Sequence, residues 1–182
     1  MKRKALILSA ALLFWLLCQL SPVYRVRIGG ESPTLCLSPA AFREGLACAG
    51  DTAAELLGPE VALPAFSRSL RLGLRPARQD AAVLSDALLR AAEGIDAADC
   101  VRVNGETLGA VRNGAALLEA LRALIREGLP EGAAVGNLGG TLELSPVYTR
   151  AGTEIAEADM LRTVTALAPV FYLDAEGRAL AG

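Results

Sequence analysis

The feature that most constrains this chain is residues 101–111, where an Asn-Gly pair separates two short runs of alternating apolar residues. Asn-Gly in this setting is the strongest short-range sequence signal for a β-hairpin with a type I′ turn. Residues 26–31 match residues 101–106 at four of six positions, 75 residues earlier in the chain. The sequence therefore predicts a repeated unit that opens with a strand and a tight turn. The predicted turn residues are Asn104, Gly105, Gly29 and Gly30.

A helix is predicted after each hairpin. Ser38 and Asn113 occupy equivalent positions and both are good N-cap residues, and a proline follows Ser38 at the first helical position. In the second unit, apolar residues recur at helical spacing over 117–125. Gly45 and Gly50 make the first helix weaker, and we expect them to interrupt it.

Each unit then continues with a strand and a second helix. Residues 70–74 and 142–146 alternate apolar and other side chains, as half-buried strands do. Residues 170–177 align with the strand and turn at 98–105, which predicts an incomplete third unit or a closing strand. We expect an α+β fold with an N-terminal transmembrane or signal helix and two small β-hairpin–helix–strand–helix units. The predicted parts are residues 1–24, 25–99, 100–171 and 172–182.

The amino terminus has three cations at positions 2–4, followed by an apolar run from 5 to 20. As a helix this run spans about 24 Å, less than the roughly 30 Å hydrocarbon core, and extension to Tyr24 restores the length. A small-x-small cleavage pattern is missing, so we favour an uncleaved signal-anchor over a cleaved secretory signal. The charge bias predicts a single-pass cell-membrane protein whose carboxyl-terminal part is extracytoplasmic, or a secreted protein if cleavage occurs. The predicted anchor residues are Leu6, Leu8, Leu12, Leu13, Phe14, Trp15, Leu16 and Leu17.

The composition excludes several kinds of chemistry. The chain has no histidine, which removes serine–histidine and cysteine–histidine catalysis and the commonest metal ligand. After position 24 the chain holds 15 basic and 20 acidic residues, a balance that disfavours polyanionic partners. We therefore expect no catalytic residue, no cofactor, no metal and no nucleic acid partner.

The four cysteines have no CxxC spacing. A disulfide between Cys36 and Cys48 is one interpretation if the domain is exported. The interpretation we favour treats Cys36 and Cys100 as small buried apolar residues, because Cys36 aligns with Val111 and Cys100 begins an apolar strand.

Four groups of residues offer candidate sites, and each has a simpler structural explanation. The first group consists of five acids. A pair of acids catalyses glycoside hydrolysis when a cleft holds the two carboxyl groups at a fixed separation, but these five flank predicted helix ends, where acids favour the first turn or solvent. Residues 136–140 lack phosphate-loop spacing and are interpreted as a flexible linker. Three aromatic residues would suit either sugar stacking or packing, and four arginines would suit either an anionic surface or solvent. The residues concerned are Asp96, Asp99, Glu154, Glu157 and Asp159; Tyr148, Phe171 and Tyr172; and Arg71, Arg75, Arg78 and Arg90.

The order of motifs resembles the amino-terminal repeat region of extracytoplasmic peptidoglycan hydrolases from clostridia-like Firmicutes. In that family a signal-anchor and such repeats precede a lysostaphin-type zinc endopeptidase domain. The resemblance implies an accessory or stalk-like portion only, because the histidine-bearing catalytic domain is absent from this sequence. The matching residues are Val101, Val103, Gly105, Gly109 and Val111, with Val26, Ile28 and Gly30 as a second copy.

The predicted function is a non-enzymatic, membrane-anchored extracytoplasmic spacer or interaction module at the bacterial cell envelope. Its expected partners are the lipid bilayer, through the amino-terminal segment, and peptidoglycan or another envelope protein. The alternative is the amino-terminal fragment of a peptidoglycan hydrolase whose catalytic zinc domain is missing or separately encoded.

Overall fold

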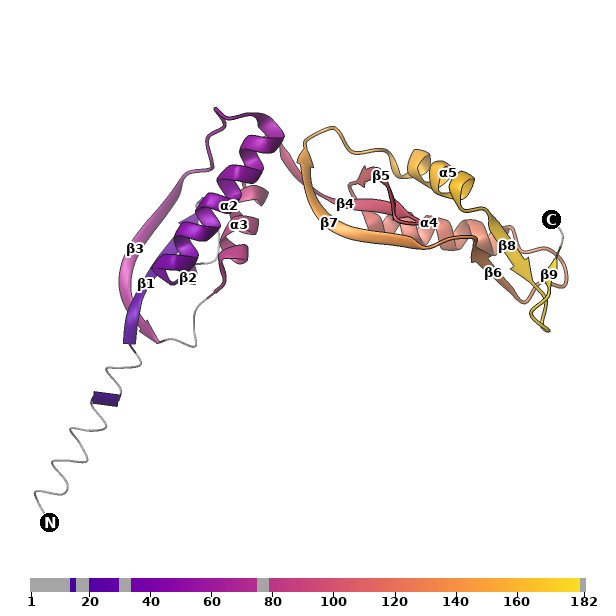
Figure 1. Ribbon diagram of the computed structural model, residues 1–182, viewed down its shortest axis with the longest axis horizontal. Helices are drawn as coiled ribbons and strands as arrows, with labels where there is room; N and C mark the ends of the chain where they lie inside the picture. Colours follow the sequence, from indigo (N-terminus) through magenta and orange to yellow (C-terminus); the bar gives the residue numbers. More distant parts are fainter. Residues whose placement is uncertain (1–13, 16–19, 30–33, 75–78, 181–182) are drawn as a thin grey trace, which may run out of the picture. The chain divides into compact units, whose positions relative to one another are not determined.

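The computed structural model describes residues 14–15, 20–29, 34–74 and 79–180, and shows an α+β protein (Figure 1). The chain divides into two compact units, Met1–Glu93 and Gly94–Gly182. The sequence pattern placed the second unit's start at residue 100. The structural division falls earlier because strand β4 (Ile95–Val103) pairs along its whole length with β7 (Leu142–Arg150) of the second unit.

The predicted transmembrane helix is corrected by the structure. Across the described ranges, no helix combines the length and the apolar character needed to cross a membrane. Residues 20–24, assigned to the end of the anchor, belong to strand β1 (Leu20–Ile28), which pairs with β3 (Phe66–Leu74) at nine consecutive positions. Pro22 favours this outcome, because proline lacks the N–H that a helix interior requires. Phe14 and Trp15 are helical and exposed, and the other predicted anchor residues lie outside the described residues.

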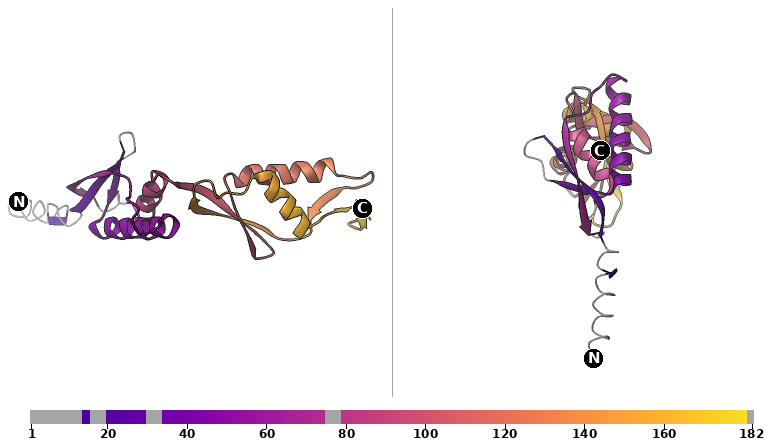
Figure 2. Two further views of the ribbon diagram at one scale, coloured as in Figure 1. Left: turned by 90° about the horizontal axis from the view of Figure 1, so that it is seen from above. Right: turned by 90° about the vertical axis from the view of Figure 1, so that its left-hand side faces the viewer.

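The first unit is a three-stranded antiparallel sheet with one face covered by helix α2. The sheet order is β2-β1-β3, where β2 is Leu35–Leu37. Helix α2 (Pro39–Leu57) lies along this sheet (Figures 1 and 2). It places Phe42 against Tyr24 of β1 and Phe66 of β3, with ring centroids 5.0 and 5.9 Å apart. Helix α3 (Ala81–Arg90) packs along α2. The core therefore lies between one sheet face and α2.

Helix α2 is continuous, contrary to the predicted interruption. Ser38 caps it by accepting a hydrogen bond from the Ala41 N–H at 3.0 Å, as its sequence position predicts. Gly45 is buried, and a Cβ at this position would lie 2.5 Å from the Ala81 carbonyl oxygen. This glycine therefore allows close contact between α2 and α3, and helix packing outweighs its low helix propensity.

The second unit repeats this arrangement. Its main sheet has the order β5-β4-β7, with β5 at Glu106–Val111, so the first strand of each unit is central. Helices α4 (Gly114–Glu127) and α5 (Glu157–Leu167) cover one face, and Asn113 caps α4 as predicted. Both helices contribute to one buried cluster with the sheet. Its members are Val101, Val103, Val111, Leu117, Met160, Val164 and Ala168.

A further sheet of order β6-β8-β9 completes the described part of the second unit. Strand β6 (Val135–Leu138) lies where we predicted a flexible glycine-rich linker, and it pairs with β8 (Val170–Leu173). Strand β9 (Ala179–Leu180) forms a hairpin with β8, and Asp174 accepts the Arg178 N–H at 2.8 Å in the turn. The segment that aligned with β4 is thus a strand followed by a turn and a partner strand.

Equivalent burial along β1 and β4 supports the alignment of the two units. Each of the three buried positions of β1 corresponds, at the offset of 75 residues, to a buried position of β4. They are Val23, Val26 and Ile28 in β1, and Ala98, Val101 and Val103 in β4. A register shift between Val101 and Arg102 alters the pairing with β5, so Cys36 does not occupy the buried position of Val111. Cys36 and Cys100 are half-buried, Cys48 is exposed, and all three are free thiols.

Candidate binding surface

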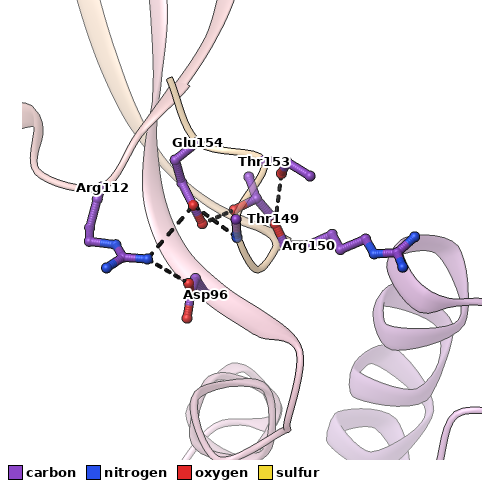
Figure 3. Close-up of polar contacts among 7 residues, drawn as sticks. Asp96, Arg112, Thr149, Arg150, Thr153 and Glu154 are labelled. Carbon is purple, nitrogen blue, oxygen red and sulfur yellow. Dashed lines mark hydrogen bonds and ion pairs between the residues drawn. The ribbon is translucent and has the colours of Figure 1, made fainter. Parts of the chain in front are cut away.

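Two candidate acids, Asp96 and Glu154, meet in a polar network with Arg112 (Figure 3). Arg112 Nη2 lies 3.0 Å from Asp96 Oδ2 and 3.8 Å from Glu154 Oε2. Glu154 also accepts the Thr149 hydroxyl at 3.0 Å and the Gly152 N–H at 3.1 Å. These groups form a local brace between β4, β5 and the loop after β7.

The environment of Glu154 keeps its carboxylate charged. A hydrogen bond from its own backbone N–H is the main cause of a pKa below the usual value, and the Thr149 hydroxyl, Arg112 charge and Gly152 N–H act in the same direction. Burial opposes them, because desolvation favours the neutral acid. A carboxylate with a lowered pKa and several local donors is unsuited to the general-acid role of glycoside hydrolysis.

The remaining candidate acids also take local structural roles. Asp99 accepts the Gly114 N–H at 2.8 Å, where the side chain meets the amino end of α4. Asp159 pairs with Arg162 in the first turn of α5, where Glu157 also lies. Among the described residues no group of three or more potential metal ligands is present.

The predicted hairpin turn connects β4 to β5. Asn104 and Gly105 have φ values of 52° and 83°, the positive values that a type I′ turn requires. Asn104 also exchanges two hydrogen bonds with Thr141: its N–H donates to the Thr141 carbonyl at 2.9 Å, and its Oδ1 accepts the Thr141 N–H at 3.0 Å. The turn therefore fixes the start of β7 as well. Gly29 follows β1 with φ 67°, and Gly30 lies outside the described residues.

The aromatic candidates are not brought together into one stacking surface. Phe171 and Tyr172 are consecutive in β8, so their side chains project to opposite faces, and Phe171 is exposed. Tyr148 lies in β7 and so belongs to a different sheet. The aromatic cluster that does form is Tyr24, Phe42 and Phe66 in the first unit.

The face of the first sheet opposite α2 carries a concavity of about 300 Å³. Arg25 and Arg27 alternate with the buried Val26 and Ile28 of β1, so they project to this face. Arg27 lies opposite Ser67 and Arg25 opposite Ser69, while Arg71 continues the row on β3. We call this the arginine face. It comprises Arg25, Arg27, Thr34, Ser67, Ser69 and Arg71, all exposed.

The described charges on the arginine face are all positive. Arg68 also borders the concavity, and its guanidinium carbon lies 5.5 Å from the Tyr24 ring centroid and 5.4 Å from the Phe42 ring centroid. Among the described residues, no carboxylate lines the concavity and no ion pair joins Arg25, Arg27 or Arg71 to an acid. Three guanidinium groups and three hydroxyl groups can all donate hydrogen bonds to an anion.

Sequence reasoning grouped Arg71 with different arginines. Arg75 and Arg78 lie outside the described residues, and Arg90 lies on α3, where it pairs with Asp86 at 2.9 Å. The alternation of Arg25 and Arg27 along β1 was available in the sequence. The missing information was the register with β3, which brings Ser67, Ser69 and Arg71 beside them.

The fold and this surface define a class: an α+β protein of two related sheet–helix units, the first with an open, cationic sheet face. Comparison with known proteins gives no relative for it: no family model, curated protein or solved structure matches the chain.

Proposed function

We propose that this protein is a non-enzymatic, extracytoplasmic spacer or interaction module at the bacterial cell envelope. The observation that carries the proposal is the arginine face: a concave surface on an open sheet, in one of two related units, whose described lining residues include no acid. Such a surface suits binding, because its described residues offer many hydrogen-bond donors and no general base to activate a hydroxyl group.

The non-enzymatic part of the proposal is supported by the roles of the candidate acids. Asp96, Asp99, Glu154 and Asp159 each bond to a nearby arginine or backbone N–H. The chain also contains no histidine. The candidate site that is left is the arginine face, whose side chains can donate hydrogen bonds to a ligand.

The location rests on sequence. Three cations followed by an apolar run at the amino terminus are typical of an export signal. The resemblance to repeat regions that precede peptidoglycan hydrolase domains favours the cell envelope over the free extracellular medium.

A sedimentation assay with purified cell-wall sacculi tests the proposal. The full chain, kept in neutral detergent, is mixed with sacculi that retain their anionic polymers and with sacculi stripped of them. Binding to either preparation that falls when Arg25, Arg27 and Arg71 are changed to Gln, but not when Arg102 is changed to Gln, supports the proposed function. Absence of binding to both preparations, with no envelope protein recovered by crosslinking, would contradict it.

A further inference from the structure

We infer that the arginine face is a binding site for short, linear, phosphate-bearing oligoanions, an inference that rests on the interaction function proposed above. Arg25 and Arg27 are two residues apart on one strand, which separates their Cα atoms by about 6.8 Å. Arg71 lies opposite Val23 and is a diagonal neighbour of Arg25 on β3. Three cations in a row favour a ligand with several spaced charges over a single small anion.

The hydroxyl groups beside the arginines add hydrogen-bond donors for the oxygen atoms of a phosphate group. Ser67 and Ser69 lie directly opposite Arg27 and Arg25, and Thr34 lies on the other side of Arg27. Arg27 Nε donates to Thr34 Oγ1 at 3.0 Å, which orients the guanidinium while leaving its terminal nitrogens available. A guanidinium group can donate two parallel N–H bonds to two oxygens of one phosphate, and neighbouring hydroxyl groups can donate to the other phosphate oxygens.

The second unit provides an internal comparison, because the equivalent face of its sheet does not carry a net positive charge. At the offset of 75, Arg102 corresponds to Arg27 and again bonds a threonine, Thr107, at 3.1 Å. However, Arg102 lies opposite Glu143 on β7, where the first unit has a serine. Cys100 stands at the position of Arg25, and Val147 at that of Arg71. The formal charge of these positions is therefore zero in the second unit and +3 in the first.

The surroundings of the arginine face favour a soluble ligand over a lipid bilayer or a nucleic acid. Leu70 and Leu72, the exposed apolar residues of β3, alternate with Ser69 and Arg71 and so lie on the opposite face. The described residues that line the concavity include no aromatic side chain on which a base would stack. The ligand must then be held by its charge and its oxygen atoms.

Titration calorimetry with sodium tripolyphosphate tests the inference on the full chain in neutral detergent. One exposed ion pair contributes up to about fivefold in affinity, so Arg25→Gln, Arg27→Gln and Arg71→Gln combined should weaken binding by about a hundredfold. Arg102→Gln, the matched control, should leave the affinity within about twofold. Circular dichroism and the thermal midpoint verify that each variant is folded, since all four side chains are exposed.

Absence of tripolyphosphate binding by the folded wild type, or equal loss in the triple variant and in Arg102→Gln, would overturn the inference. Phosphatidylglycerol and phosphatidylcholine vesicles separate the two sources of phosphate. Arginine-dependent binding to phosphatidylglycerol vesicles without tripolyphosphate binding would overturn the assignment to a soluble oligoanion. Arginine-dependent sedimentation with sacculi but without tripolyphosphate binding would overturn the ligand class alone and leave the proposed function standing.

Discussion

Arg27 donates its Nε–H to Oγ1 of Thr34 at 3.0 Å, across the pair formed by β1 and β2. The same bond recurs 75 residues later between Arg102 and Thr107, at 3.1 Å, across β4 and β5. The two sheets have the same strand order, and the same side-chain hydrogen bond crosses the same pair of strands in each. The residues that align in sequence therefore also occupy equivalent positions in the structure. This hydrogen bond also shows where the units have diverged, because the partner opposite the arginine on the third strand is Ser67 in one sheet and Glu143 in the other.

This divergence predicts that the phosphate site can be transferred from one unit to the other. In a chain with Gln at positions 25, 27 and 71, the changes Cys100→Arg, Glu143→Ser and Val147→Arg should restore the charge of the face around Arg102. We expect most of the tripolyphosphate affinity to return, measured by calorimetry. Glu143→Ser alone is the control and should restore little. Failure of the folded, charge-restored variant to bind would show that spacing and charge on this sheet face are insufficient.

The hairpin turn yields a prediction confined to the second unit. Gly105 has φ +83° and space around its Cβ position, so Gly105→Val causes backbone strain without a clash. The expected cost is about 1–3 kcal/mol, because a β-branched residue resists positive φ. Hydrogen-exchange mass spectrometry should show faster exchange across β4, β5 and β7 only, since β4 pairs with the other two strands.

Gly105→Asn is the milder control for this turn, because asparagine tolerates the left-handed conformation. Equally accelerated exchange in β1 and β3 would contradict the assignment of β4 to the second unit alone.

Two glycines of helix α2 should respond in opposite directions to alanine. At Gly45 a Cβ would lie 2.5 Å from the Ala81 carbonyl oxygen and 3.0 Å from the Leu84 Cβ, so Gly45→Ala should destabilise the first unit by about 1–3 kcal/mol. At Gly50 a Cβ meets nothing within 4 Å, so Gly50→Ala should stabilise it by up to about 1 kcal/mol. Urea denaturation followed by far-ultraviolet circular dichroism measures both. A stabilising Gly45→Ala would be incompatible with the close contact between α2 and α3.

Local signals predicted much of this fold. Asn104-Gly105 gave the hairpin, and Ser38 and Asn113 marked the amino ends of α2 and α4, because turn and cap chemistry depends on neighbouring residues only. The prediction that Gly45 interrupts α2 was wrong for the opposite reason. The effect of this glycine depends on α3, which begins at Ala81, and no local pattern shows that contact.

Longer-range pairing explains the other differences. Residues 20–24 continued an apolar run typical of a membrane helix, but their pairing with β3 makes them a strand. Leu70 and Leu72 alternate as half-buried residues do, yet they are 60% and 73% exposed, because the described ring contacts of α2 with β3 involve Phe66 and Arg68, at the other end of the strand.

The candidate surface depended on register in the same way. The negative net charge of the chain argued against polyanionic partners, but net charge does not show where the charged residues lie on the surface. The pairing of β1 with β3 gathers Arg25, Arg27 and Arg71 on one face.

Glu154 makes the second unit sensitive to acid. Its pKa is below the ordinary 4.5 in the folded state, so its stabilising effect is complete above about pH 4.5 and is lost as the pH falls through the lower, folded-state pKa. Glu154→Gln should therefore destabilise the second unit at pH 7, by about 1–2 kcal/mol for the hydrogen bonds to the charge. The difference from wild type should shrink below about pH 4.5. Hydrogen exchange of the 149–154 loop measured between pH 3 and 7, corrected for the intrinsic exchange rate, follows it.

Thr149→Val provides the matched control, because it removes one donor to Glu154 and leaves the carboxylate in place. The pKa of Glu154 should rise toward its ordinary value in this variant, so the loss of stability on acidification should begin at a higher pH than in wild type. A Glu154→Gln difference that stayed constant from pH 7 to pH 3 would show that the charge of Glu154 contributes nothing. The contact with Arg112 would then be a packing contact between side chains, and the brace between β4, β5 and the 149–154 loop would be independent of pH.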